Sequence, residues 1–495
     1  MHSDSDTTAH TEMDTLIAAL HPHIAMSLFK YNLYPPRSLG PRKDTDGSLE
    51  LARAFATLFR FHPGCSAAAV AARPTVAESR ARSTSFSVCL SPSTPPDFES
   101  SLAKWLAQLR DLREESESMD RDSTALTFSP SEERFILYTY GVCYPAMHRL
   151  IKERGFGSWI SFVKERKPVP GYTPSKPTVE EAELAQKYAD EIRAFSGLVR
   201  GFAERVAHES LGEDGDVLRF HKLCVAIRDM RSNDGFLDYL DTYVRTYLAG
   251  SVPRQLGEAE LNYISPTDYG VIQPRLAYFH LPLAVSTIIA LCRDKKISLD
   301  DLQGWALLDP LKGARRFSAV IEESYLAEHF GKERGIRWKA VVEAFNRRWA
   351  VGPMGYDMGY QLDAGTNTMS TARLVVVHPE IALIQHLLDS EGGENPNLKR
   401  AKAHIACSRT PCYATGAYAV AVNQAFGTRF TMDVDDPDWC RLDDVEPWIL
   451  PENAPEGVVA KTKESLLEDL GWLIVQWMGD TGFSTVSSDD VFFWE

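Results

Sequence analysis

The feature that most constrains the fold is a change in the hydrophobic pattern of the sequence near Val351. After this residue, short β-branched and apolar stretches alternate with stretches that place apolar residues at helical spacing. The predicted order is strand, helix, strand, helix, strand and helix, over residues 371–377, 380–388, 403–407, 412–426, 429–434 and 457–478. Strands and helices in alternation are typical of a sheet covered by helices, so the last third of the chain predicts an α/β layer.

The chain before Val351 has a different pattern, which is dominated by helices. Between the first two predicted helices, residues 67–96 are rich in Ala, Arg and Ser and end in a proline-rich run, so we expect an exposed loop there. Four prolines and a glycine within residues 165–177 predict a linker. Apolar residues at positions i, i+3, i+4 and i+7 predict helices at 48–61, 98–115, 131–152, 179–208, 217–229, 235–248, 274–292, 299–308 and 314–330.

These patterns predict a fold of class α+α/β, in which a large, mainly helical N-terminal region precedes a C-terminal α/β domain. A chain of 495 residues is too long for one ordinary domain, and its hydrophobic fraction of 44% is enough for a substantial core. We expect three parts: residues 1–175, an uneven region of helices and loops; residues 176–336, a helical region; and residues 337–495, the α/β domain.

Charge and cysteine usage limit the partners and the compartment. The net charge of -15 argues against a protein that coats nucleic acid or an anionic membrane. A small-molecule substrate is therefore favoured over a long nucleic acid, and the helical region is where we expect a protein partner to bind. No apolar run of 18 or more residues predicts a membrane span. The polar N-terminus and eight scattered cysteines predict an intracellular protein, cytoplasmic or nuclear, with reduced thiols.

The candidate functional residues lie at two predicted corners, where a strand ends and the next helix begins. His378 ends the first buried strand, Glu380 lies in the first turn of the next helix, and Pro411-Cys412 opens the following helix. In zinc deaminases, a His from one helix start and two Cys from another hold Zn²⁺, which acidifies a bound water. A Glu two residues after the His is not a ligand but moves a proton from that water to the ring and the leaving amine.

Both corners resemble the cytidine deaminase-like superfamily, and most closely a fungal branch with a helical N-terminal region. The resemblance is carried by residues 373–384, with His378-Pro379-Glu380, and by residues 404–415, with Pro411-Cys412. It implies an α/β sandwich, a first helix at 338–349, and an opening β-hairpin of residues 355–362 and 371–377 turned through 363–367.

The resemblance also implies roles for individual residues. His378 and Cys412 match zinc-ligand positions, and Glu380 matches the catalytic proton shuttle. The implied activity is zinc-dependent hydrolytic deamination of a nucleobase, a nucleoside or a related amino-heterocycle.

One departure from the family pattern concerns the third zinc ligand. The family places a second cysteine three residues after Cys412, where this chain has Thr415, and a neutral hydroxyl is a poor zinc ligand. The alternative is therefore a metal-free, degenerate deaminase-like module with a binding or scaffolding role. Four residues are weaker candidates for the missing ligand. We expect the Cys407 side chain to point into the sheet, His386 and His404 to lie too far from the corner, and Cys440 to lie in a loop whose path the sequence does not predict.

A third hypothesis places the chemistry in the helical region. Asp238 and Asp241 resemble the acidic motifs of terpene cyclases, which bind Mg²⁺–diphosphate. No second metal motif follows downstream, and acidic pairs at this spacing are usually a solvated helix face. This hypothesis therefore ranks below the two deaminase-like ones.

Overall fold

The computed structural model describes helices, strands and turns of both the N-terminal and the C-terminal parts of the chain. The described residues form two compact units, one made of segments within 66–94 and 304–495 and the other of segments within 47–65 and 95–303. The structure describes residues 47–76, 82–118, 128–153, parts of 194–231, 277–299, parts of 302–310, 318–320, 360–363, 368–371, 377–390, 402–408, 411, 413–432 and most of 450–466.

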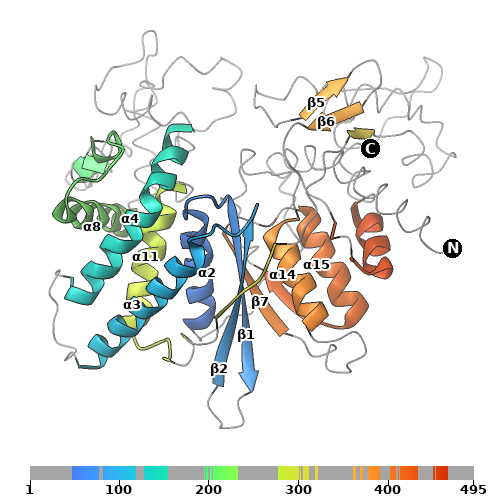
Figure 1. Ribbon diagram of the computed structural model, residues 1–495, viewed down its shortest axis with the longest axis horizontal. Coiled ribbons are helices and arrows are strands. Elements are labelled where there is room, and N and C mark those ends of the chain that lie inside the picture. The colour runs from blue at the N-terminus through green and yellow to red at the C-terminus, as the bar shows by residue number, and fades with distance from the viewer. Residues whose placement is uncertain are drawn as a thin grey trace, which may run out of the picture. The chain divides into compact units, whose positions relative to one another are not determined.

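The first unit is built on a mixed five-stranded sheet with the order β3-β2-β1-β7-β8 (Figure 1). Strand β1 is antiparallel to both β2 and β7, whereas β7 and β8 are parallel, as are β2 and β3. The strands are β1 (Ala67–Val76), β2 (Arg82–Ser91), β3 (Trp305–Leu307), β7 (Lys402–Cys407) and β8 (Arg429–Met432). The centre of this sheet therefore joins a hairpin from the first hundred residues to strands from the last hundred.

The β1–β2 hairpin corrects the expectation that residues 67–96 form an exposed loop. The two strands pair over ten consecutive residues each, from Ala67 opposite Ser91 to Val76 opposite Arg82. Residues 67–72 are buried. Alanine and serine are weak strand formers on their own, but burial between two partner strands outweighs that local preference. The partners are distant in sequence, so local patterning contained no sign of them.

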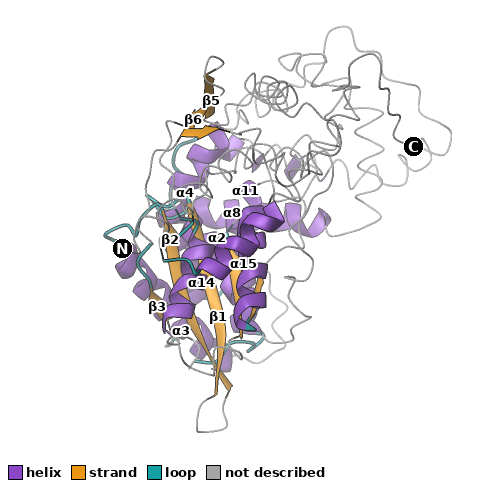
Figure 2. Ribbon diagram, turned by 90° about the vertical axis from the view of Figure 1, so that its right-hand side faces the viewer, coloured by secondary structure: helices purple, strands orange, loops and turns teal. Residues whose placement is uncertain are grey.

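Two helices cover one face of this sheet in both views of the molecule (Figures 1 and 2). Helix α14 (Pro379–Ser390) packs on β1, β2 and β7, and helix α15 (Tyr413–Phe426) packs on β8 and on α14. Because β7 and β8 are parallel, α15 is the crossover between them, as parallel pairing requires. Gly427, with a φ of 66°, ends α15 in the left-handed conformation that glycine adopts without a Cβ penalty.

A second, three-stranded sheet has the order β4-β6-β5. Its strands are β4 (Ser318–Val320), β5 (Tyr360–Asp363) and β6 (Thr368–Thr371). Strands β5 and β6 form an antiparallel hairpin around the turn at 363–367 that the resemblance implies, but β6 shares only Thr371 with the implied strand at 371–377. The hairpin pairs with β4 rather than with the strand at 402–407. The opening hairpin of the large sheet is β1–β2 instead.

The second unit consists of helices around an aromatic core. Phe59 contacts the rings of Phe98 and Trp105, and the Trp105 indole donates a hydrogen bond of 3.1 Å to Thr139. The helices are α2 (Gly47–Arg60), α3 (Phe98–Ser118), α4 (Pro130–Glu153), α8 (Asp214–Arg231) and α11 (Ala277–Arg293).

The predicted class is confirmed at the level of helices combined with a mixed sheet. Five predicted helices of the first 300 residues are present with nearly the predicted bounds, but part of the helix predicted at 299–308 is strand β3, and part of the one at 314–330 is strand β4. The parts predicted as 1–175, 176–336 and 337–495 stay a prediction, because the linker at 165–177 lies outside the described residues.

Candidate functional site

The start of α14 places two of the residues predicted for the site. The carbonyl of His378 accepts the N–H of Ala382 at 3.0 Å, so His378 is the N-cap of the helix. Pro379 follows at the first helical position, where its missing N–H has no cost. Glu380 then lies in the first turn, only 4% exposed, where the positive end of the helix dipole favours a carboxylate. The imidazole of His378 is half-buried.

The start of α15 meets the start of α14 at position 415. Thr415 is fully buried, and its hydroxyl Oγ1 lies 3.4 Å from Nδ1 of His378. The two residues are 37 positions apart, so the fold brings together the two helix starts that the sequence pattern selects. Thr415 thus stands beside the imidazole at the position where the family pattern has a ligand cysteine.

Whether this corner suits a zinc ion depends on its donor atoms. The Nδ1 of His378 is a good zinc donor, but the facing Thr415 hydroxyl is neutral and hard, so this pair does not fit the metal. Cys412 lies outside the described residues, so its role as a ligand stays a prediction. Among the described residues, no group of three or more His, Cys, Asp or Glu side chains is arranged to hold a metal ion.

The weaker ligand candidates that the structure describes have other partners. Cys407 is buried at the end of β7 and donates its S–H to the carbonyl of Ile405. His386 lies two turns along α14, and its Nε2 donates to the carbonyl of Asp309 at 2.8 Å. His404 is hydrogen-bonded through Nδ1 to Thr431 at 3.0 Å. Cys440, like Cys412, is not among the described residues.

Strand β1 holds the segment that leads from β7 to the corner. Ser408 follows β7 directly and is fully buried. Its N–H donates to the carbonyl of Ala68 at 2.9 Å, and its hydroxyl accepts the N–H of Ala68 at 2.8 Å. Pro411, three residues further on, is also buried. The N-terminal hairpin therefore fixes the approach to α15.

Cys89 of β2 is a residue near the site that sequence reasoning missed. Burial is the main cause that raises the pKa of its thiol to about 12, and the nearby carboxylates of Glu380 and Asp309 act in the same direction. Its cross-strand partner Ala69 is in turn paired with Cys407, so the three side chains form a row on one face of the sheet. No local signal at Cys89 indicates this, because the hairpin pairing creates it.

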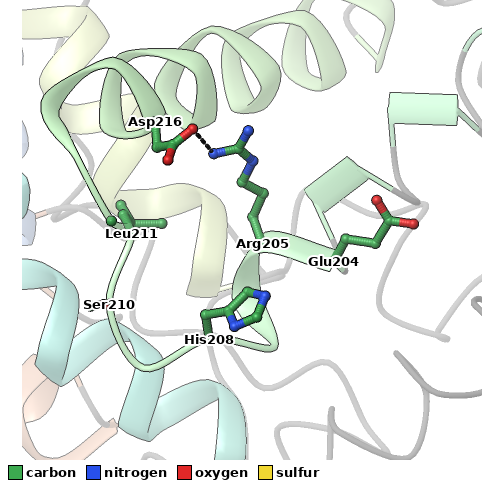
Figure 3. Close-up of a pocket in the computed structure, with 7 residues that line it drawn as sticks. Glu204, Arg205, His208, Ser210, Leu211 and Asp216 are labelled. Atoms are coloured by element: carbon green, nitrogen blue, oxygen red, sulfur yellow. Dashed lines mark hydrogen bonds and ion pairs between the residues drawn. The ribbon is translucent and has the colours of Figure 1, made fainter.

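The helical unit has one pocket worth comparing with this corner (Figure 3). It has a volume of about 430 Å³ and is lined mainly by polar side chains of residues 204–216. Arg205 and Asp216 point toward each other across it and form an ion pair of 2.8 Å, which lowers the pKa of Asp216. These two charges already satisfy each other, so they select no ligand. Asp238 and Asp241 lie outside the described residues, and the diphosphate hypothesis stays a prediction.

In the described part of the chain, no helix combines the length and the apolar character needed to cross a bilayer. Comparison of the chain with models of known protein families, with curated proteins and with solved structures gave no match. An assignment of function therefore depends on the chemistry of the corner formed by His378, Glu380 and Thr415.

Proposed function

We propose that the corner formed by His378, Glu380 and Thr415 is a cytidine deaminase-like site that binds a nucleobase, a nucleoside or a related amino-heterocycle. The observation that carries this proposal is the approach of Thr415 to Nδ1 of His378 at 3.4 Å, with the buried Glu380 two residues after His378 in the first turn of α14. The deaminase-like pattern requires these two helix starts to meet, although 37 residues separate them. The mixed sheet beneath α14 and α15 supports the same proposal.

Glu380 is the group that we expect to recognise the heterocycle. Amino-heterocycles present an exocyclic amino group and, in some forms, a ring N–H, both of which donate hydrogen bonds. An ionised carboxylate only accepts hydrogen bonds, and charge-assisted bonds are roughly twice as strong as neutral ones. Burial strengthens them further, because the local dielectric is low. A buried carboxylate at a helix start therefore suits this class of ligand.

Binding of nucleosides by the purified full chain tests the proposal. Isothermal titration calorimetry with cytidine, adenosine and their free bases should give saturable binding of at least one ligand. Glu380→Gln should weaken it by about 10- to 100-fold, the loss of one charge-assisted hydrogen bond. The matched control is Glu456→Gln, an exposed glutamate in the first turn of the helix at residues 456–466. No binding by any member of the panel would contradict the proposal.

A second candidate function is hydrolytic deamination. The observation in its favour is the two-residue spacing of His378 and Glu380, with Nδ1 directed at position 415. Ammonia release from the same nucleoside panel, lost in Glu380→Gln, would establish it. Binding without ammonia release would leave the corner as a recognition site.

A further inference from the structure

We infer that this chain holds its deaminase-like corner together with hydrogen bonds where the superfamily uses zinc, and that the corner binds no metal. The inference rests on the proposed function for the identity of the corner. It goes further by deciding between a metal-dependent and a metal-free site. Its observation is the contact between the Thr415 hydroxyl and Nδ1 of His378.

The distance between these two atoms matches a pair of zinc ligands. With Zn–N near 2.1 Å, Zn–S near 2.3 Å and a tetrahedral angle, two such ligand atoms lie roughly 3.6 Å apart. The Oγ1 of Thr415 and Nδ1 of His378 are 3.4 Å apart. The side chain at position 415 therefore lies where a zinc ligand would lie, but it lacks the donor atom that zinc requires.

The Thr415 hydroxyl bonds directly to the imidazole of His378, with no metal ion between them. A hydroxyl stays protonated near neutral pH and both donates and accepts hydrogen bonds, so it pairs with an imidazole nitrogen without an intervening cation. The Thr415 side chain is fully buried, so water can compete for this contact only from the side of the half-buried imidazole. Of the three ligand positions in the family pattern, only His378 and the predicted Cys412 carry zinc donors in this chain, fewer than the three or four of ordinary sites.

A second hydrogen bond joins the same two helices further along. The hydroxyl of Tyr418 in α15 donates to Oε1 of Gln385 in α14 at 3.1 Å, and both side chains are buried. Gln385 also donates to Asp389 at 2.9 Å, which fixes its amide. Helices α14 and α15 are thus cross-linked at two points by hydrogen bonds, the role that a bridging metal ion would otherwise have at their starts.

The test is the zinc content of the full chain and of variants at positions 378 and 415, purified in the presence of zinc and measured by mass spectrometry of the metal. The wild type should hold less than about 0.1 zinc per chain, and Thr415→Cys should raise this to about one. His378→Ala combined with Thr415→Cys should remove the gain. Thr415→Ser is the matched control, because it keeps the hydroxyl and should stay without zinc.

The outcomes that overturn the inference are equally specific. Near-stoichiometric zinc in the wild type, lost in His378→Ala, would show a metal site without a thiolate at position 415. A folded Thr415→Cys that takes up no zinc would show that position 415 does not lie where a zinc ligand would lie. If Thr415→Cys fails to fold, the wild type decides: a fall in its melting temperature upon chelation would overturn the inference, and an unchanged one would support it.

Nucleoside binding separates this inference from the proposed function. A zinc-free wild type that binds a nucleoside supports both. A zinc-loaded wild type that binds a nucleoside overturns the inference alone. A zinc-free wild type that binds no member of the panel overturns the proposed function alone.

Discussion

Ala68 and Ser408 form a reciprocal pair across 340 residues of sequence: each N–H donates to an oxygen of the other residue, at 2.8 and 2.9 Å. The pair lies where β1 meets the end of β7, immediately before the segment that leads to Thr415. The corner that carries the proposed site therefore depends on a hairpin from the opposite end of the chain.

The Ser408 hydroxyl should measurably stabilise this junction. Ser408→Ala leaves the buried N–H of Ala68 without its acceptor, which costs about 1–3 kcal/mol. We expect the amides of residues 67–72 and 402–408 to exchange about 5- to 150-fold faster, measured by hydrogen exchange and mass spectrometry. Ser85→Ala is the control, because no described residue is hydrogen-bonded to the buried Ser85 hydroxyl. Equal effects of the two substitutions would contradict the assignment.

The isolated C-terminal part of the chain should not fold. A fragment of residues 337–495 keeps α14, α15, β7 and β8 but lacks β1, so one edge of β7 loses its hydrogen-bonded partner. We expect little chemical-shift dispersion in its NMR spectrum and no cooperative melting. A cooperative transition with dispersed amide signals would show that β7 does not need the N-terminal hairpin.

Both of these predictions concern the pairing of β1 with β7, which could not be predicted from the sequence. The start of α14 was predictable, because a proline at the first helical position and an acidic first turn are local signals. The start of α15 was predicted from Pro411 and the run of small residues that follows it. The pairing of β1 with β7 was not, because strand pairing is decided by distant partners and a stretch of alanines has no strand pattern of its own. The influence of the Glu380 carboxylate on the Cys89 thiol was missed for the same reason.

The hairpin β5–β6 shows the same division between local and distant information. Its turn at 363–367 was implied by the family resemblance, although the second strand begins earlier, at Thr368, than the implied strand at 371–377. Its partner, β4, was predicted to be helical, so the sheet that the hairpin joins was predicted wrongly. At the corner itself, the pattern identified position 415 as the missing ligand, but the bond from Thr415 to His378 required the fold.

The helical unit should lose stability as the pH falls below about 6.5. Burial holds the pKa of His62 below its ordinary value of 6.5, although the carbonyl of Pro63 and the charge of Asp97 oppose this. Between the folded pKa and 6.5, the unfolded chain binds a proton that the folded chain does not. The free energy of unfolding should therefore fall by up to about 1.4 kcal/mol per pH unit in this window and level off below the folded pKa.

Urea denaturation at a series of pH values measures this effect. His62→Gln should flatten the dependence, even though it lowers stability at every pH by removing the contact with Ser101. Leu58→Ala, a destabilised variant that keeps His62, should retain the slope. A slope unchanged in His62→Gln would assign it to other groups.

Glu132 should contribute more to stability than other acidic residues of the helical unit. Its side chain is 5% exposed, accepts two hydrogen bonds from Arg293 at 2.5 and 2.7 Å, and accepts the N–H of Ser129 before α4. Glu132→Ala should lower the free energy of unfolding by about 1–3 kcal/mol. Asp294→Ala should cost at most about 0.5 kcal/mol, because its pair with Lys296 is exposed. A difference below the error of urea denaturation would contradict this ranking.

The claim that Thr415 replaces a zinc ligand is tested most directly by the position of zinc in crystals of Thr415→Cys, located by anomalous scattering at the zinc absorption edge. We expect one peak per chain, about 2.1 Å from Nδ1 of His378 and about 2.3 Å from the introduced sulfur, and no peak there in wild-type crystals grown with the same zinc. A wild-type peak at His378, or a variant peak elsewhere only, would contradict the claim that Thr415 replaces a ligand of a deaminase-like corner.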